Sequence, residues 1–467
     1  MLQIKFGTDG WRSLIANDFT VDNVMRISVG AAKWMLQKGN KKVIIGFDTR
    51  FAGLMFAKAA AIPFAEKGIK VLIDPEFVTT PMVSFATREW KAGLGVVITA
   101  SHNPPDYNGY KLKSKSGGPL LSDGIKEIEA LIPDYKPISK ADFDFYANKG
   151  LIEEVNLESI YFDHLKNNFD LDSIMNASNS IAYDSMFGAG RKIMRKLFPD
   201  AIHLHDENNP GFKGIPPEPI LRNLMELEHL VRTEKDIKIG IANDGDADRI
   251  GLFDEDGIFV DAHHILLLLL YYQVTLKKLS GKVVVSAAAT EKLEKLAKIY
   301  GLGFQYTKIG FKNITPIMLN EDVLLAGEEA GGMATKGHLP ERDGIWVSLM
   351  ILEMMNRTGK SLKELIEVIY ELVGSFAYDR IDLKLPEELK TKIVKRCESG
   401  QISEIGGEKV ISTLDVDGYK YYLAEDKWIM IRPSGTEPVL RLYAQAENTT
   451  EVQSLLHRVV KELNPEK

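Results

Sequence analysis

The chain has 467 residues, of which 45% are hydrophobic and 26% are charged, and its 65 acidic and 58 basic residues give a net charge of −7. This balance is typical of a folded, water-soluble protein and excludes an intrinsically disordered chain. It also argues against nucleic acid or a membrane surface as the partner, because both favour a basic face. The length favours three or four domains.

The cellular location follows from the cysteine content and from hydropathy. Cys397 is the only cysteine, so no intrachain disulfide can form and the reducing cytosol is the expected environment. The first five residues lack the apolar stretch of a signal peptide. The most apolar segment, 265–272, is much shorter than the roughly 20 residues of a membrane span. We therefore expect a cytoplasmic protein in which 265–272 is a buried core helix.

Short apolar strands alternate with helical patterns through most of the chain. The strand-like runs are 43–47, 96–98, 181–183, 237–242 and 283–285, and helical patterns follow at 52–67, 191–198 and 290–299. Uninterrupted apolar strands that alternate with helices predict an α/β fold with mixed or parallel sheets covered on both faces. Three strand–turn–helix units begin near Val43, Ile181 and Val283, which predicts three similar α/β domains.

The boundaries between the domains are placed at turns and at changes in pattern. Pro133 and Pro137 interrupt the chain after a helix, and Gly257 lies in a turn. From Gly374 onward the pattern changes to alternating strands and a closing helix, which is typical of a smaller α+β domain. We predict domain I at 1–150, domain II at 151–256, domain III at 257–373 and domain IV at 374–467.

The first segment with chemical potential is 99–104, Thr-Ala-Ser-His-Asn-Pro. Ser101 comes directly after a strand, at the sheet edge where α/β folds present ligands. Asn103, Pro104 and Pro105 exclude a helix and force a turn that would hold Ser101 outward. The alternative is an ordinary turn built from turn-forming residues, and this segment alone favours that alternative.

The second segment is 243–249, which carries three aspartates at alternate positions after an apolar strand. Their carboxylates would repel one another strongly unless a cation neutralised them, and oxygen-only ligands select Mg²⁺ over zinc. An EF-hand is excluded because Arg249 and the apolar strand 250–253 interrupt the loop before Glu255, where the bidentate glutamate would stand. A solvated acidic turn is the remaining alternative.

Two further loops complete the pattern. Segment 432–438, Arg-Pro-Ser-Gly-Thr-Glu-Pro, is followed by Arg441 and offers hydroxyls, backbone N–H groups and two arginines to a phosphate. A plain turn is an equally good interpretation of that loop alone. In 327–332, Glu328 could accept hydrogen bonds from sugar hydroxyls, although a tight turn is the alternative. Nucleophile, metal loop, hydroxyl acceptor and phosphate cradle together indicate phosphoryl transfer on a phosphorylated sugar.

These segments, together with 6–12 near the N-terminus, resemble those of the α-D-phosphohexomutases, which include phosphoglucomutase and phosphomannomutase. The resemblance implies a heart-shaped protein of three related α/β domains with mixed sheets plus a C-terminal α+β domain, with the active site in a central cleft. It implies interconversion of hexose 1-phosphate and hexose 6-phosphate through a phosphoserine and a bisphosphorylated sugar. Mg²⁺ would be the cofactor, hexose 1,6-bisphosphate the activator, and the protein a monomer or homodimer.

The resemblance also assigns roles to individual residues. Ser101 would be the phosphoserine and would join the aspartates of the acidic loop around Mg²⁺. Lys111 would be the general acid or base, with a pKa lowered by nearby positive charge and desolvation. Glu328 would bind sugar hydroxyls. The remaining implied residues are Asp244, Asp246 and Asp248 as metal ligands, Arg12, Arg249 and His102 beside the phosphoryl group, and Arg432, Ser434, Gly435, Thr436 and Arg441 at the second phosphate.

The sequence departs from many relatives in the loop that would bind the sugar. Ala330 replaces a serine and removes one hydroxyl partner, and Gly332 stands where many mannose and glucose enzymes have histidine. Segment 338–344 resembles the corresponding segment of bacterial phosphoglucomutases, and Arg342 within it would supply a second basic group. In the expected specificity loop the candidate contacts are Lys308, Gly310 and Lys312.

Several activities are consistent with this site. Glucose 1-phosphate is the favoured substrate and mannose 1-phosphate the next. A phosphopentose or amino-sugar phosphate mutase remains open because of Ala330. A Mg²⁺-dependent sugar phosphatase and a catalytically silent sugar-phosphate binder are the alternatives from other classes.

Overall fold

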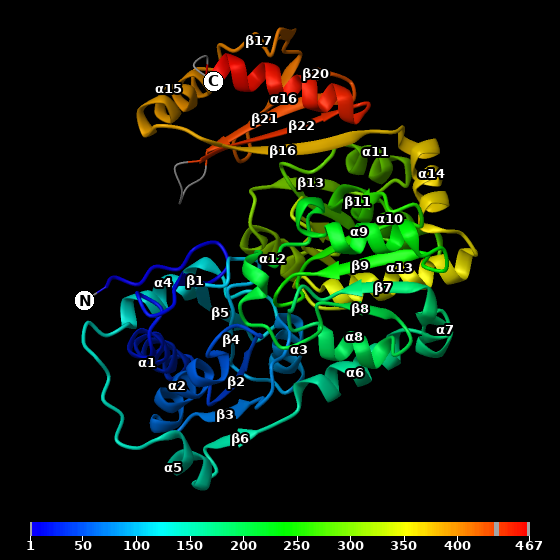
Figure 1. Ribbon diagram of the computed structural model, residues 1–467. Coiled ribbons are helices and arrows are strands. Elements are labelled where there is room, and N and C mark those ends of the chain that lie inside the picture. The colour runs from blue at the N-terminus through cyan, green and yellow to red at the C-terminus, as the bar shows by residue number, and fades with distance from the viewer. Residues whose placement is uncertain (1, 434–438, 465–467) are drawn as a thin grey trace. The chain divides into compact units, whose positions relative to one another are not determined.

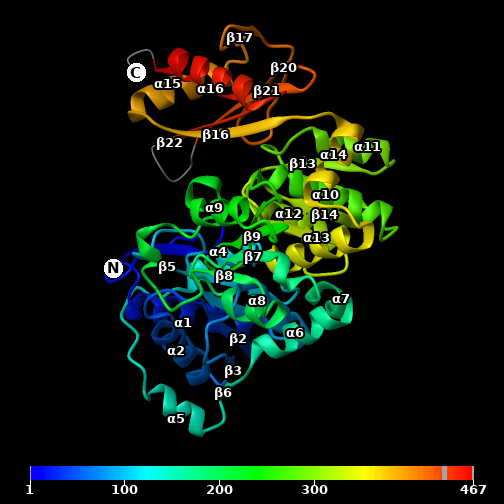
Figure 2. The ribbon, with the colours of Figure 1, turned by 45° about the vertical axis from the view of Figure 1, so that its right-hand side comes forward.

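The computed structural model describes residues 2–433 and 439–464. The chain forms two compact units, which are described separately (Figure 1). The first unit contains residues 1–279 and 310–365, and the second contains 280–309 and 366–467. Figure 2 shows the same elements from a second direction.

A six-stranded mixed sheet with the strand order β1-β5-β4-β2-β3-β6 forms the N-terminal part of the first unit. Strand β2 pairs in parallel with β3 and β4, whereas β5 pairs antiparallel with β4 and β1. The strands are β1 Trp11–Leu14, β2 Lys42–Phe47, β3 Lys70–Ile73, β4 Leu94–Ile98, β5 Tyr107–Ser114 and β6 Ile152–Glu154.

Helices cover both faces of this sheet because its central strands are apolar on both sides. Val43 and Ile45 on β2 pack into a core with the helices of one face. The next residue along the strand, Gly46, lies against Val78 and Val83 on the opposite face, where a Cβ would have no room. The helices are α1 Val21–Gln37, α2 Gly53–Glu66, α3 Thr80–Glu89, α4 Ser122–Leu131 and α5 Phe143–Asn148.

A five-stranded mixed sheet with the order β11-β10-β9-β7-β8 follows in the same unit (Figure 1). Strand β7 pairs in parallel with β8 and β9, and β10 pairs antiparallel with β9 and β11. The strands are β7 Ile181–Asp184, β8 Ile202–Leu204, β9 Ile239–Asn243, β10 Ile250–Phe253 and β11 Phe259–Val260. The helices are α6 Leu157–Asn168, α7 Leu171–Met175, α8 Arg191–Leu197 and α9 Met225–Thr233, with short 3₁₀ turns at Ser178–Ser180, Phe212–Gly214 and Leu221–Asn223.

The rest of the first unit packs around an apolar helix. Residues 265–270 lie fully buried in α10, which confirms the predicted core helix. No helix in the part of the chain that the structure describes is long and apolar enough to cross a membrane. The elements here are α10 Ala262–Thr275, α12 Phe311–Asn320, the antiparallel pair β14 Val323–Gly327 and β15 Met333–Thr335, and α13 Gly344–Thr358.

The second unit combines a parallel strand pair with an antiparallel sheet of order β16-β22-β21-β20-β19. The parallel pair is β12 Lys282–Ser286 and β13 Phe304–Thr307, with α11 Lys292–Ile299 between them in the chain, and α14 Leu362–Val373 leads in from the first unit. The remaining elements are β16 Ala377–Lys384, α15 Glu387–Glu398, β17 Glu404–Ile405, β18 Glu408–Lys409, β19 Ser412–Leu414, β20 Tyr419–Ala424, β21 Lys427–Pro433, β22 Val439–Ala446 and α16 Thr449–Leu463.

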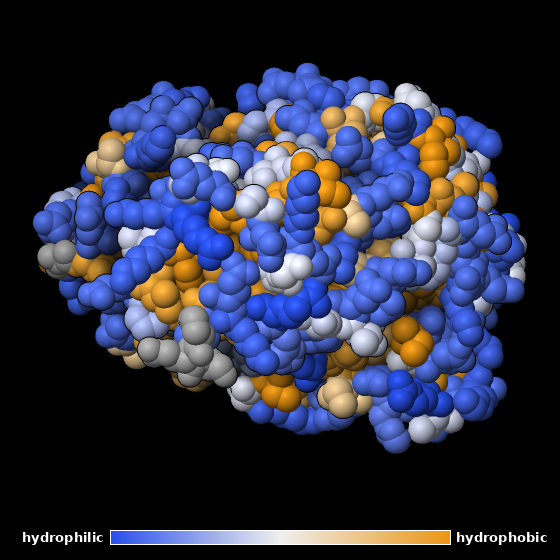
Figure 3. Space-filling view, turned by 90° about the horizontal axis from the view of Figure 1, so that it is seen from above, coloured by the Kyte–Doolittle hydropathy of each residue, from blue (hydrophilic) through white to orange (hydrophobic). Residues whose placement is uncertain are grey.

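The predicted fold class is confirmed. Mixed sheets with helices are present in the N-terminal part, and the C-terminal part is an antiparallel sheet with helices, as the change of pattern near Gly374 indicated. Figure 3 shows a surface on which hydrophilic residues predominate and apolar residues occur in small groups, as expected from the composition.

Candidate active site

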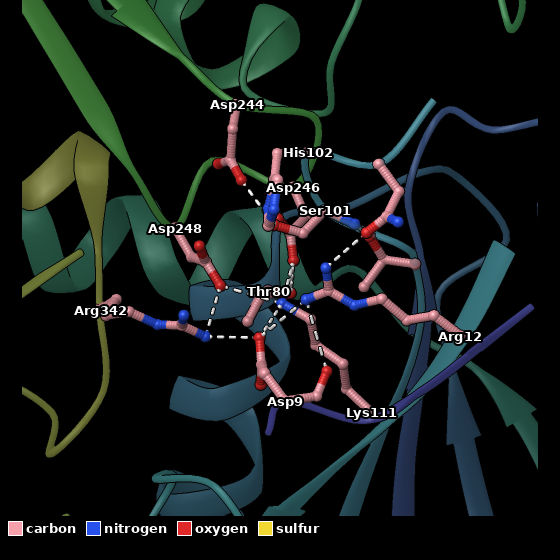
Figure 4. A network of polar contacts seen from close by, with 12 residues as sticks. Asp9, Arg12, Thr80, Ser101, His102, Lys111, Asp244, Asp246, Asp248 and Arg342 are labelled. Atoms are coloured by element: carbon pink, nitrogen blue, oxygen red, sulfur yellow. Dashed lines mark hydrogen bonds and ion pairs between the residues drawn. The ribbon is translucent and has the colours of Figure 1, made fainter. Parts of the chain in front are cut away.

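Ser101 lies just beyond the end of β4, in a turn that holds its backbone in an unusual conformation. Its φ of 53° falls in the left-handed region, which costs a non-glycine residue about 1–3 kcal/mol. Its backbone N–H donates to Thr99 Oγ1 at 2.9 Å, and its hydroxyl donates to Asp244 Oδ2 at 2.7 Å (Figure 4). The turn therefore directs the serine hydroxyl at the acidic loop.

The three aspartates lie together in the loop between β9 and β10. Asp244, Asp246 and Asp248 are all buried, and each offers a carboxylate oxygen within 4.8 Å of the others. The loop also approaches the serine turn closely, because a Cβ on Gly245 would lie 2.6 Å from the Ser101 carbonyl oxygen. Glycine at 245 is thus required for Ser101 and the acidic loop to meet.

The donor set of this loop fits a hard divalent cation. Oδ1 of Asp246 and Oδ1 of Asp248 are buried, and neither has a hydrogen-bond partner among the described residues. Burial and the charges of its two neighbours hold the pKa of Asp244 well above its usual range. Buried carboxylate oxygens without donors are costly unless a cation compensates them, so these residues could bind a metal such as Mg²⁺.

Lys111 on β5 lies among carboxylates rather than among cations. Its Nζ is 2.7 Å from Asp246 Oδ2, 2.9 Å from Asp248 Oδ2 and 2.8 Å from Asp9 Oδ2. Burial alone would lower the pKa of Lys111, but these carboxylates outweigh burial and raise that pKa above its ordinary value. The expected lowering of the Lys111 pKa was therefore wrong for this state, because β5 delivers the ammonium to the acidic loop.

Asp9 joins Lys111 to two arginines (Figure 4). Its Oδ2 lies 3.3 Å from an Arg12 guanidinium nitrogen and 2.7 Å from Arg342 Nη2, and the same Arg342 nitrogen lies 2.8 Å from Asp248 Oδ2. Arg12 also donates to Asn103 Oδ1 at 2.6 Å, so it reaches the serine turn. Burial would raise the pKa of Asp9, but the surrounding cations hold that pKa well below its usual range.

Arg342 is placed by its two neighbours in sequence. Asp343 caps the N-terminus of α13 by accepting from the backbone N–H groups of Ile345 and Trp346. Glu341 is fully buried and pairs with the equally buried Lys113 at 2.5 Å. Arg342 was predicted as a second basic group, and the structure brings it to the acidic loop.

His102 and Arg249 flank the serine and the acidic loop. His102 Nδ1 is 3.3 Å from Ser101 Oγ, and burial with nearby cations, Arg249 first among them, holds the pKa of His102 well below its usual range. The imidazole is therefore neutral near pH 7. The Arg249 guanidinium lies 4.0 Å from Asp248 Oδ1 and 3.8 Å from Glu218 Oε1.

The predicted sugar-binding loop places Glu328 close to the start of α12. Glu328 Oε1 accepts from the backbone N–H of Gly310 at 2.6 Å, and burial raises the pKa of Glu328 to about 7. Gly310 has a φ of 111°, and a Cβ there would lie 2.5 Å from Thr8. Ala330 is partly exposed in the turn after β14, and Lys312 lines a cavity beside residues 5–10.

The second unit holds the other predicted contacts. Asp417 Oδ2 lies 3.0 Å from Arg432 Nε and also accepts from the backbone N–H of Ile309, so it links β21 to the segment after β13. Arg441 stands opposite Arg432 in the sheet, and Lys308 is exposed. Their binding roles stay predictions. The other members of the predicted phosphate cradle, Ser434, Gly435 and Thr436, lie outside the described residues.

Sequence reasoning gave no role to several residues at this site. Asp9 stands in the quoted segment 6–12, and its place there was the available signal. Thr80 donates to Asp246 Oδ2 at 2.5 Å, and its backbone N–H donates to the Asp246 carbonyl at 3.0 Å. Arg50 and Asp48 support the serine turn from behind. Nothing in the local sequence of Thr80 or Arg50 indicates these contacts.

Comparison with known protein families accounts for most of the chain. Four domain models of the phosphoglucomutase/phosphomannomutase family match in order: α/β/α domain I at 3–138, α/β/α domain II at 159–257, α/β/α domain III at 261–373 and the C-terminal domain at 392–462.

Individual relatives extend over nearly the whole chain. A Pyrococcus furiosus protein named probable phosphoglucosamine mutase is 30% identical, and the match covers 97% of this chain and 96% of that protein. A Sulfurisphaera tokodaii phosphoglucosamine/phosphogalactosamine mutase is 28% identical, over 98% of each chain. A crystal structure from Thermus thermophilus, provisionally described as a phosphomannomutase, matches with a TM-score of 0.87 and 33% identity over 99% of both chains. The chain therefore belongs to the α-D-phosphohexomutases, a family of intramolecular phosphotransferases.

Proposed function

We propose that this protein interconverts hexose 1-phosphate and hexose 6-phosphate and carries the transferred phosphoryl group on Ser101. The observation that carries the proposal is the 2.7 Å contact between Ser101 Oγ and Asp244, within a buried acidic triplet that has two oxygens without donors among the described residues. A serine that served only as a turn former would not need a buried acidic loop opposite its hydroxyl.

The reaction begins with phosphorylated Ser101. A free hydroxyl of the sugar monophosphate attacks the phosphorus, and the bond from phosphorus to Ser101 Oγ breaks. A sugar bisphosphate forms, and the proton lost by the sugar hydroxyl is balanced by the one gained at Ser101 Oγ. The bound bisphosphate then reorients, and its other phosphoryl group is transferred to Ser101. Mg²⁺ held by Asp244, Asp246 and Asp248 would supply positive charge against the phosphoryl oxygens. Arg12 lies beside the serine turn through Asn103 and can stabilise the same charge.

Lys111 is the proposed proton donor for the sugar oxygen. Surrounded by three carboxylates, it is protonated near neutral pH, so in this state it can donate a proton and cannot accept one. It is therefore suited to protonate the sugar oxygen that leaves when phosphate returns to Ser101. Acting as a base toward the attacking hydroxyl would require a lower pKa of Lys111, which a cation held by Asp246 and Asp248 would favour by neutralising their charge.

The substrate assignment rests on the sugar loop and on the relatives. Glu328 can accept hydrogen bonds from two hydroxyls of a pyranose, which favours a hexose, and glucose 1-phosphate is the first candidate. Glucosamine phosphate is the second candidate, because relatives that match almost the whole chain are named phosphoglucosamine mutases. A coupled assay with glucose, mannose, glucosamine and ribose 1-phosphates as parallel substrates ranks the candidates by kcat/KM.

The mutase and the phosphatase give different products in one experiment. Catalytic amounts of hexose 1,6-bisphosphate should stimulate interconversion of the monophosphates, because the bisphosphate rephosphorylates Ser101. Ser101→Ala should abolish the reaction, whereas Ser116→Ala, which removes a hydroxyl from the turn after β5, should leave it unchanged. If inorganic phosphate is the main product, the protein is a phosphatase and the proposed mutase function is wrong.

A further inference from the structure

Arg50 contacts the serine turn, residues 101–107, at four backbone positions. The residue follows β2, and only 3% of its surface is exposed. One terminal nitrogen donates to the carbonyl oxygens of Pro104 and Tyr107 at 2.8 and 3.0 Å. The other donates to those of Ser101 and Asn103, both at 2.6 Å. A single guanidinium thus binds four carbonyls of the segment 101–107.

The guanidinium is itself held in place. Its Nε lies 3.3 Å from Asp48 Oδ2, and the Arg50 backbone N–H donates to Asp48 Oδ1 at 3.0 Å. Asp48 Oδ2 also accepts from Thr99 Oγ1 at 2.5 Å, and that hydroxyl oxygen in turn accepts from the Ser101 backbone N–H. The ring of Phe212 lies 5.0 Å from the guanidinium carbon. Asp48 and Arg50 therefore hold both the N–H and the C=O of Ser101.

We propose that Arg50 is a positioning residue for phosphoryl transfer, which holds Ser101 in the left-handed conformation that aims its hydroxyl at the acidic loop. The inference rests on the proposed role of Ser101 and goes beyond it, because Arg50 acts through the backbone of the turn that carries the nucleophile. A planar guanidinium with five fixed donors can serve four carbonyls at once, whereas a lysine ammonium has three donors. A positive charge at position 50 is therefore not sufficient to hold the turn as the guanidinium does.

Arg26 provides a matched control in the same part of the protein. It is also 3% exposed, and its guanidinium donates to the carbonyls of Pro133 and Leu2 at 2.8 and 3.0 Å. These carbonyls do not belong to the serine turn. A role that is only structural would make Arg50→Lys and Arg26→Lys behave alike.

The test compares kcat and KM of the two lysine variants in the mutase assay with saturating bisphosphate. Misplacing a nucleophile by about 1 Å costs on the order of 100-fold in rate, so Arg50→Lys should lower kcat by about that factor while KM changes by less than about threefold. Arg26→Lys should keep kcat within about twofold of the unchanged protein, even where thermal unfolding shows a similar loss of stability. Equal kcat for Arg50→Lys and the unchanged protein, or equal losses in both variants, would overturn the proposal.

Chemical rescue supplies a second readout that stability does not mimic. Added guanidinium should restore kcat of Arg50→Ala by about tenfold or more by occupying the emptied place, and should not affect Arg26→Ala. Rescue that is absent for Arg50→Ala, or equal for both variants, would count against the proposal and would decide the matter if Arg50→Lys did not fold. The intact mass of the protein separates the two hypotheses. If Ser101 is unphosphorylated in the active wild-type protein, the proposed function itself is wrong. If Ser101 is phosphorylated but Arg50→Lys keeps its full kcat, only the role of Arg50 is wrong.

Discussion

Gly332→Ala should damage the site through Arg342, although neither residue is expected to react. A Cβ at position 332 would lie 2.4 Å from Arg342 Cδ and 3.0 Å from its Cγ. Ordinary contact begins near 3.4 Å, so the side chain would have to move by 3.4 − 2.4, or about 1 Å, at Cδ. Its terminal nitrogen is already bound at 2.7 Å to Asp9 and at 2.8 Å to Asp248, and an outward shift of that size lengthens both contacts beyond hydrogen-bond range.

The magnitude follows from the charges that would lose their partner. Removing one partner of a buried ion pair costs about 3–5 kcal/mol, and partial relaxation of a long side chain reduces the cost to roughly 1–3 kcal/mol here. If the same contacts are needed in the transition state, kcat/KM falls by about 10- to 100-fold. Gly332 is thus required by Arg342, which gives a steric reason for the absence of a larger residue at this place.

The assay measures kcat/KM for glucose 1-phosphate together with the thermal unfolding midpoint. Gly303→Ala is the control, because a Cβ there would meet Lys282 only at ordinary distances of 3.7–3.9 Å. We expect Gly332→Ala to lower both quantities and Gly303→Ala to lower neither. A Gly332→Ala protein with unchanged kcat/KM and unchanged midpoint would refute the reasoning, since Arg342 would then have moved without consequence.

Three further predictions address the charge state, the metal and the sugar. Burial raises the pKa of Glu328 to about 7, so kcat/KM should rise as the pH increases through 7 and the carboxylate becomes a hydrogen-bond acceptor. Glu328→Gln should remove that step from the pH profile. The same shift should lower the stability of the folded protein as the pH rises from 4.5 to about 7, because over this interval the folded state holds a proton that the unfolded chain has lost. Chelation by EDTA should abolish activity, and added Mg²⁺ should restore it. The thermal unfolding midpoint should be higher in Mg²⁺, because the cation relieves repulsion among the three aspartates. An unchanged midpoint would count against a metal at that loop. Ala330→Ser should change the ranking among sugar 1-phosphates more than it changes kcat, and an identical ranking would contradict its place in the sugar loop.

Local pattern was sufficient for much of the fold. The apolar run at 265–272 could only be a buried helix in a chain this polar, and it is the centre of α10. The acidic loop was predictable because three aspartates directly after the apolar strand β9 must share one small space. Its meeting with Ser101 was expected from the resemblance to the phosphohexomutases, because β4 and β9 belong to different sheets whose ends need not meet.

Contacts between distant segments could not be predicted in this way. Lys111 lies 135 residues from Asp246 in sequence, and only the placement of β5 against the acidic loop shows that its ammonium is surrounded by carboxylates. The expected pKa shift of Lys111 therefore had the wrong sign. Thr80 lies 166 residues from Asp246, and Arg50 lies 51 residues from Ser101. A threonine and an arginine after strands have many ordinary functions, so these roles depend on tertiary structure alone.

The most direct test of the central claim is to locate the phosphate and follow its departure. The protein is incubated with glucose 1,6-bisphosphate whose phosphates are isotopically labelled, digested, and mapped by mass spectrometry before and after a brief chase with unlabelled glucose 1-phosphate. We expect an additional mass of about 80 Da plus the label on the peptide that contains Ser101, and replacement of the labelled phosphate by an unlabelled one during the chase. Phosphate on another residue, or labelled phosphate that the chase leaves on Ser101, would contradict the account.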